Sequence, residues 1–310
     1  MNGKIYCSLC GMENYPLLKY CDNCGKLLKT NRITPEPVYD TFNDVLIHNK
    51  YRILKTNITE DTYNKIIENI ERIILMNLNF HSNETCLFRV YKLVQQFSRF
   101  YYDNQKNTYV YFSGDNIFYN DKISETEKIC KLLHELASHL YSEIFEQILM
   151  YIFNSKKNTY IEAFVTLLSA KNSCYILSKE YLACVSENYF TRNLMNNYLF
   201  VVNIIQERNI DTVVAKKMCM LGNTVADDVI KILDRFIPEQ FREEIQEQAF
   251  NDNIEHVSMS MCDVKKISNS EKIDLIKAMI EFSYSALSEN SKDIMDINRF
   301  IEDFKMINRN

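Results

Sequence analysis

Apolar and polar positions follow a helical period along most of the chain from about residue 40 onward. Between Thr59 and Asn77, large apolar residues recur at spacings of three and four, which places them on one face of an α-helix. The segment therefore predicts an amphipathic helix that packs one face into a core. The residues of this face are Tyr63, Ile66, Ile67, Ile70, Ile73 and Ile74.

The same spacing predicts a series of further helices. Two of them begin with a Ser-x-x-Glu capping box, at Ser124–Glu127 and at Ser268–Glu271, in which two side chains satisfy amides that a helix start leaves free. The first box opens the longest helix, whose apolar stripe runs from Ile129 to Ile152. The expected ranges are 84–100, 124–154, 159–171, 178–188, 191–207, 212–221, 223–235, 239–250, 268–288 and 291–307.

One segment has the composition of a β-hairpin rather than a helix. Aromatic and β-branched residues fill Tyr109–Phe112 and Ile117–Tyr119, and they flank a glycine-containing turn at Ser113–Asn116. Glycine and proline are scarce, with 5 and 4 residues in a chain of 310, which favours long helices over tight turns. The predicted fold class is mainly α (α+β), with a helical body that contains a small β-hairpin.

The N-terminal segment carries two matched metal-binding knuckles. Each is a Cys-x-x-Cys pair followed by glycine, and a short spacer separates the pairs. Structural zinc prefers a closed tetrahedron of four thiolates, which leaves no open position for catalysis. The segment resembles the zinc-ribbon domains at the N-termini of many bacterial proteins, and such ribbons bind proteins or nucleic acids. The predicted ligands of one structural zinc ion are Cys7, Cys10, Cys21 and Cys24.

A proline-containing stretch separates this module from the helical body. Pro35 and Pro37 fix their backbone φ angles, lack amide donors and disfavour helix in the residues before them. We therefore predict a zinc ribbon over 1–30, a linker over 31–40 and a mainly helical domain over 41–310.

The charge of the chain limits its partners. A net charge of −5 argues against a protein that binds nucleic acid over its whole surface. The ribbon is mildly basic, because Lys4, Lys19, Lys26, Lys29 and Arg32 outnumber its two acidic residues. This excess is compatible with a nucleic-acid contact or with an ordinary solvated surface. We expect a protein partner more than a nucleic acid.

The cysteine count fits a reducing compartment. No apolar run reaches the ~18–20 residues that cross a bilayer, and the N-terminus lacks a secretion signal, so we expect a cytoplasmic protein with no membrane partner. Thiols stay reduced there, and the ten cysteines are interpreted as four zinc ligands and six free thiols that act as small buried apolar residues. The six are Cys86, Cys130, Cys174, Cys184, Cys219 and Cys262.

The longest predicted helix contains the sequence His-Glu-Leu-Ala-Ser-His, from His134 to His139. With the preceding strand and capping box, it resembles the His-Glu-x-x-His helix of small gluzincin-type metallopeptidases, in which two histidines bind zinc. The resemblance implies that Glu135 activates a metal-bound water as general base. It also implies a third ligand on a later helix, for which Glu180 is the first choice and Glu162 the second.

The motif departs from this family at one position. Ser138 stands where the family has its second histidine, and His139 follows one residue later. Side chains five residues apart on a regular α-helix diverge by about 140°, so His134 and His139 bind one ion only if a π-bulge rotates them together.

Three interpretations of this helix remain open. A zincin-like fold that has lost its second zinc would act as a pseudoenzyme that binds a protein. An altered second zinc site would use His134, His139 or Ser138, and Glu180, and would support a zinc-dependent peptidase with Glu135 as base. The third interpretation is an ordinary core helix.

Overall fold

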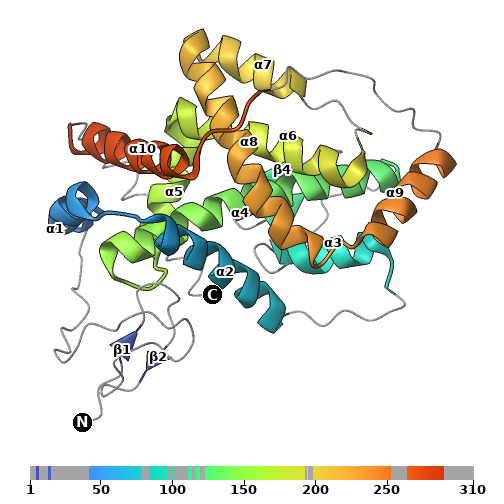
Figure 1. The fold of residues 1–310 in the computed structure, drawn as a ribbon, viewed down its shortest axis with the longest axis horizontal. Helices are drawn as coiled ribbons and strands as arrows, with labels where there is room; N and C mark the ends of the chain where they lie inside the picture. The colour runs from blue at the N-terminus through green and yellow to red at the C-terminus, as the bar shows by residue number, and fades with distance from the viewer. Residues whose placement is uncertain are drawn as a thin grey trace. The chain divides into compact units, whose positions relative to one another are not determined.

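The computed structural model describes residues 5–6, 13–14, 42–77, 84–95, 99–100, 111–113, 116–118, 123–192, 194, 198–252 and 264–289 (Figure 1). These residues are mainly helical, which confirms the mainly α class. The helices are α1 (Phe42–Lys55), α2 (Glu60–Asn77), α3 (Cys86–Gln95), α4 (Glu125–Phe153), α5 (Thr159–Lys171), α6 (Ser173–Thr191), α7 (Tyr198–Glu207), α8 (Thr212–Asp234), α9 (Glu239–Asn251) and α10 (Asn269–Glu289).

Among the described residues, two short strands lie in the segment predicted as a hairpin, over 111–113 and 116–118, whereas a third, over 99–100, lies within the range 84–100 that was predicted as helix. Strand β1 (Ile5–Tyr6) pairs antiparallel with β2 (Glu13–Asn14). Strand β5 (Asn116–Phe118) pairs antiparallel with β4 (Tyr111–Ser113) and parallel with β3 (Arg99–Phe100). Most residues of the predicted ribbon, the linker, the hairpin turn and the helix over 291–307 lie outside the described residues, so these features stay predictions.

The predicted helices differ from the observed ones at informative places. Helix α8 is continuous where two helices were predicted, over 212–221 and 223–235. In the structure the residue between these ranges, Gly222, lies at a close contact with α6. Helix α6 begins at Ser173, before the predicted residue 178, since its buried residues are spread around the helix and no apolar stripe marks its start. Ile73, predicted to face the core, is partly exposed.

The chain forms two compact units, and each contains separate stretches of sequence. The first consists of residues 1–69, 143–172 and 269–310. In this unit α10 contacts α1, the buried Asn172 donates a hydrogen bond of 2.8 Å to Ser283, and Lys272 lies over the ring of Tyr63 at 4.2 Å from its centroid. Its apolar core includes Ile53, Ile66, Ile148, Phe164 and Ile276.

The second unit consists of residues 70–142 and 173–268, and α6 lies at its centre. Helix α6 packs against α7, α8 and α9. A Cβ atom at Gly222 of α8 would stand 2.5 Å from the carbonyl oxygen of Ser178, so only glycine allows this approach of the two helices. Two further hydrogen bonds hold α6 against α4, one between the hydroxyls of Tyr141 and Ser178 at 2.7 Å and one between those of Ser142 and Tyr175 at 2.9 Å. Helix α6 is therefore fixed from several sides.

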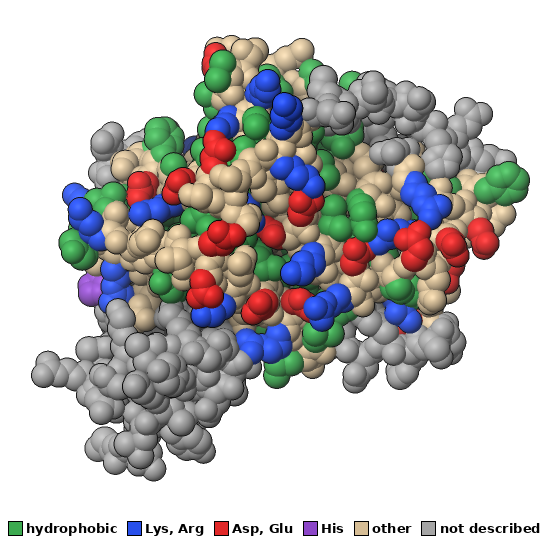
Figure 2. All heavy atoms as spheres, in the orientation of Figure 1, with side chains coloured by type: hydrophobic (Ala, Val, Ile, Leu, Met, Phe, Trp, Pro, Cys, Tyr) green, Lys and Arg blue, Asp and Glu red, His purple; other side chains and the backbone are tan. Residues whose placement is uncertain are grey.

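The described surface carries charged side chains of both signs beside exposed apolar side chains. Figure 2 shows acidic and basic side chains interspersed on the face that it draws, rather than gathered by sign. Among the helices that the structure describes, none combines the length and the apolar character needed to span a bilayer.

Candidate metal centre

The start of α4 is fixed by the capping box that the sequence predicts. The Ser124 hydroxyl accepts a hydrogen bond of 3.2 Å from the amide of Glu127, and the Glu127 carboxylate accepts one of 3.1 Å from the amide of Ser124. Asp252 adds a second cap, since its carboxylate accepts bonds from the amide and the hydroxyl of Thr126, at 3.1 and 2.7 Å. This confirms the predicted box and anchors the helix that carries His134.

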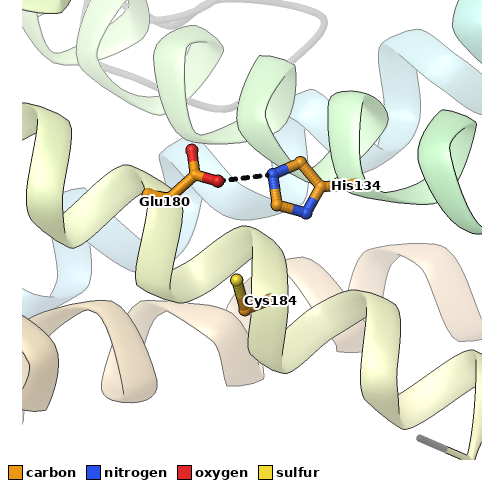
Figure 3. Close-up of side chains that lie close together, drawn as sticks. All are labelled: His134, Glu180 and Cys184. Atoms are coloured by element: carbon orange, nitrogen blue, oxygen red, sulfur yellow. Dashed lines mark ion pairs between the residues drawn. The ribbon is translucent and has the colours of Figure 1, made fainter. Parts of the chain in front are cut away.

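His134 on α4 faces two carboxylates of α6, and Figure 3 shows one of them, that of Glu180. Its Nε2 atom lies 3.0 Å from Oε1 of Glu180, and its Nδ1 atom lies 3.1 Å from Oε2 of Glu187. Glu180 was the first choice for a third ligand, and the structure places it beside His134. Glu187 was not singled out from the sequence.

Cys184 completes the group, since it lies between these two glutamates along α6. Residues 180, 184 and 187 are separated by four and then three positions, so they share one face of the helix. Figure 3 shows the Cys184 sulfur on the same side of α6 as the carboxylate of Glu180. The ligand atoms of His134, Glu180 and Cys184 all lie within 4.8 Å of one another, which is close enough for this group to hold a metal ion.

Burial and charge set the protonation of the imidazole and its partner. Burial alone would lower the pKa of His134, but the hydrogen bonds and charges of Glu180 and Glu187 outweigh it and hold the pKa well above its usual range. Burial also opposes ionisation of Glu180, yet its bond to His134 and the charges of His134 and Lys179 lower its pKa. Without a metal, the pair is an imidazolium and a carboxylate.

Burial is the main cause of the pKa shifts of two neighbouring groups. Burial, followed by the charges of Glu180 and Glu187, raises the pKa of the Cys184 thiol well above its usual value, so the metal-free sulfur carries its proton. Burial also raises the pKa of Glu135, against the lowering effects of the charges of His134 and Lys179. A Zn²⁺ ion would reverse the balance at the sulfur, since a coordinating thiol is deprotonated.

His139 is not part of this group of ligand atoms. Helix α4 is α-helical from Glu125 to Phe153 with no π-turn, so nothing brings His139 round to the side of His134. Ser138 is buried, and its carbonyl oxygen accepts a hydrogen bond from Ser142. Glu162, the second choice for a third ligand, lies on α5 in the first unit.

Cys184 and Glu187 were not found from the sequence. The family resemblance implies histidines on the first helix and one glutamate on a later helix. The spacing of four and three from Glu180 to Cys184 to Glu187 places these residues on one helix face, but the helix contains further polar residues, so no stripe marks that face. A lone cysteine among apolar residues was instead interpreted as a small buried side chain, and Cys184 is indeed buried.

Comparison of the chain with protein-family models, with curated proteins and with solved structures found no match. The chemistry of the residues themselves is therefore the basis for a functional assignment. The ribbon cysteines Cys7, Cys10, Cys21 and Cys24 lie outside the described residues.

Proposed function

We propose that this chain is a zinc-binding protein whose helical body binds a protein partner and does not catalyse peptide hydrolysis. The observation that carries the proposal is the environment of His134. Both of its ring nitrogens face carboxylates of α6, and the regular helix directs His139 away from it. The histidine pair that the peptidase motif uses to hold its catalytic zinc is therefore not assembled.

The ribbon supplies the zinc-binding part of the proposal. Four thiolates in two Cys-x-x-Cys-Gly knuckles suit one structural ion, whose binding would fold a segment too small to fold unaided. The basic side chains of the ribbon leave a contact with nucleic acid as an alternative use of this module.

Exposed apolar side chains on α7 and at the start of α8 support a protein partner. Leu199 and Phe200 are 59 % and 58 % exposed, and Val213 is 75 % exposed. Val202 and Val214 add further exposed apolar surface on the same two helices. Large exposed apolar side chains on two consecutive helices are a kind of surface that protein partners cover.

A zinc-dependent peptidase is the second candidate, and one observation favours it. Glu180 lies beside His134, as the resemblance implies for the third ligand, and Glu135 occupies the position of the general base. In this alternative, zinc would be held with an altered ligand set and Glu135 would take a proton from the metal-bound water.

One assay separates the two candidates. The zinc-loaded full chain is incubated with denatured casein and with quenched fluorescent peptides, in parallel with the Glu135→Gln variant. We expect no zinc-dependent hydrolysis by either protein. Hydrolysis by the unmodified chain that disappears in Glu135→Gln would reject the binding-module proposal in favour of the peptidase.

The binding role has its own test. The full chain and a Leu199→Asp/Phe200→Asp variant are cross-linked to their partners in cell extract, and the captured proteins are compared by mass spectrometry. A partner captured by the unmodified chain and by an exposed-site control, Lys216→Asp, but lost from the double variant, supports the proposal. Equal capture by all three proteins would contradict a role for this surface.

A further inference from the structure

We propose that His134, Glu180 and Cys184 form a second zinc site within the helical body, and that Glu187 is a positioning residue that orients the His134 ring toward the ion. This site is independent of the ribbon. It also differs from the motif-based pair of histidines, because a thiolate of α6 takes the place of His139.

The geometry places three ligand atoms around one point. His134 comes from α4, whereas Glu180 and Cys184 lie one turn apart on α6, and their ligand atoms are within 4.8 Å of one another. Ligands of a tetrahedral zinc ion lie about 3.5 Å apart, given metal–ligand distances of roughly 2.0–2.3 Å. Small side-chain rotations therefore suffice to close the group around an ion.

The donor set selects the kind of metal. One imidazole nitrogen, one carboxylate oxygen and one thiolate sulfur suit a borderline-soft ion such as Zn²⁺, while Ca²⁺ and Mg²⁺ prefer oxygen ligands alone. Cys184 is fully buried and belongs to no disulfide, so its sulfur is available to the ion without competition from bulk water. Three protein ligands leave one position for water or another ligand.

Glu187 contributes through the other side of the imidazole ring. When Nε2 of His134 binds the metal, its Nδ1–H donates to the Glu187 carboxylate, 3.1 Å away. Metal-binding histidines commonly donate their second ring N–H to a carboxylate, which fixes the ring orientation and raises its basicity. The buried side chain of Glu187 is placed for this role and lies on the Nδ1 side, away from the ion.

The site can be tested in a full-length chain whose ribbon is disabled. A Cys7→Ser/Cys21→Ser variant removes two of the four ribbon thiolates, and its zinc content is measured by mass spectrometry after dialysis against limiting free zinc. We expect one bound zinc per chain. Adding Cys184→Ser or His134→Ala to this background should abolish that zinc, whereas Cys174→Ser and His139→Ala are matched controls that should retain it.

Affinity measurements test the role of Glu187. In the same background, Glu187→Gln should still bind one zinc at saturation but with an affinity lower by about 10–100-fold, as for other positioning carboxylates. Circular dichroism confirms that each variant is folded. A zinc-dependent rise in the unfolding temperature of the ribbon-disabled chain gives a second readout that needs no substitution in the site.

Three results would overturn the proposal. The first is a ribbon-disabled chain that binds no zinc and gains no thermal stability from it. The second is an unchanged zinc affinity in Cys184→Ser, which would exclude the thiolate as a ligand. Loss of the zinc in His139→Ala would instead assign the site to the two histidines of the motif. If the ribbon binds no zinc, replacing Cys7 and Cys21 leaves the zinc content of the chain unchanged. Failure of the ribbon prediction is therefore distinguishable from failure of the second site.

Discussion

Gly222 of α8 and Ser178 of α6 are in close backbone contact, so that a Cβ atom on the glycine would stand 2.5 Å from the Ser178 carbonyl oxygen. The same Cβ would lie 3.1 Å from the Leu182 amide nitrogen. Both neighbours are backbone atoms of one helix and cannot rotate away. The packing of α6, and with it the placement of Glu180 and Cys184, depends on the absence of a side chain at position 222.

Substitution Gly222→Ala should therefore destabilise the protein, although alanine favours helix more than glycine does. We expect a loss of about 1–3 kcal/mol in the free energy of unfolding, because α8 must move away from α6. Urea denaturation, monitored by circular dichroism, measures this loss of stability. Lys216→Ala, at an exposed position on α8, is the control and should change stability by less than about 0.5 kcal/mol. Equal stability of Gly222→Ala and the unmodified protein would contradict the close contact.

Asp252 should stabilise the start of α4 only while it is ionised. Burial opposes its charge, but hydrogen bonds from Thr126 and Gln248 outweigh burial and lower the pKa of Asp252 below 3.8. A carboxyl whose pKa is lowered on folding contributes stability above its unfolded pKa and loses it as pH falls through the folded value. Asp252→Asn removes the charge and should therefore lower the free energy of unfolding at pH 7 by up to about 1 kcal/mol, since solvent screens this partly exposed carboxylate.

The pH dependence checks the electrostatic part of this effect. Thermal unfolding of Asp252→Asn and the unmodified protein is compared between neutral pH and an acid pH below the lowered pKa of Asp252, where the aspartate is protonated in both the folded and the unfolded protein. The two proteins should approach equal stability in acid. A difference that stays constant across the range would mean that the charge of Asp252 contributes nothing.

The buried hydrogen bond from Asn172 to Ser283 should stabilise the first unit. Its length is 2.8 Å, and both side chains are buried. Ser283→Ala removes the acceptor and should lower the free energy of unfolding by about 1–2 kcal/mol. Ser285→Ala, at an exposed position on the same helix, serves as the comparison in chemical denaturation. The hydrogen bond would be unimportant if the two variants had the same midpoint.

Removal of the ribbon zinc should affect only the N-terminal part of the chain. In Cys7→Ser/Cys21→Ser, we expect loss of one zinc per chain and rapid proteolysis within residues 1–40, because metal binding supplies the folding free energy of so small a module. Cleavage sites are mapped by mass spectrometry after brief trypsin treatment. The helical body should remain folded. Cleavage spread across the body would show that the two parts fold together.

The helical spacing of apolar residues predicted most of the helices that the structure describes. The apolar stripe from Ile129 to Ile152 is buried in α4, and the predicted range of α5 matches the observed helix. The predicted helix boundaries were wrong at the start of α6 and at Gly222. The buried residues of α6 follow no clear helical period, and Gly222, which lies between the predicted ranges 212–221 and 223–235, continues α8 and permits its contact with α6.

Only part of the candidate site could be predicted from the sequence, and the reason is physical. The helix motif gave His134, and the family resemblance gave Glu180, because each has a recognisable local pattern. The roles of Cys184 and Glu187 depend on which face of α6 meets α4. That orientation is set by tertiary packing, including the contact at Gly222, and no local pattern reports it.

Helix α6 is largely buried between Tyr175 and Thr191, and this limits how the chain can change in length. Inserting or deleting one residue before Glu180 would turn the following side chains by about 100°, so both glutamates and the thiol would leave His134 in a single step. The same shift would bring apolar faces of the helix into mismatched surroundings. Length variation is therefore tolerable only in exposed connections such as residues 208–211.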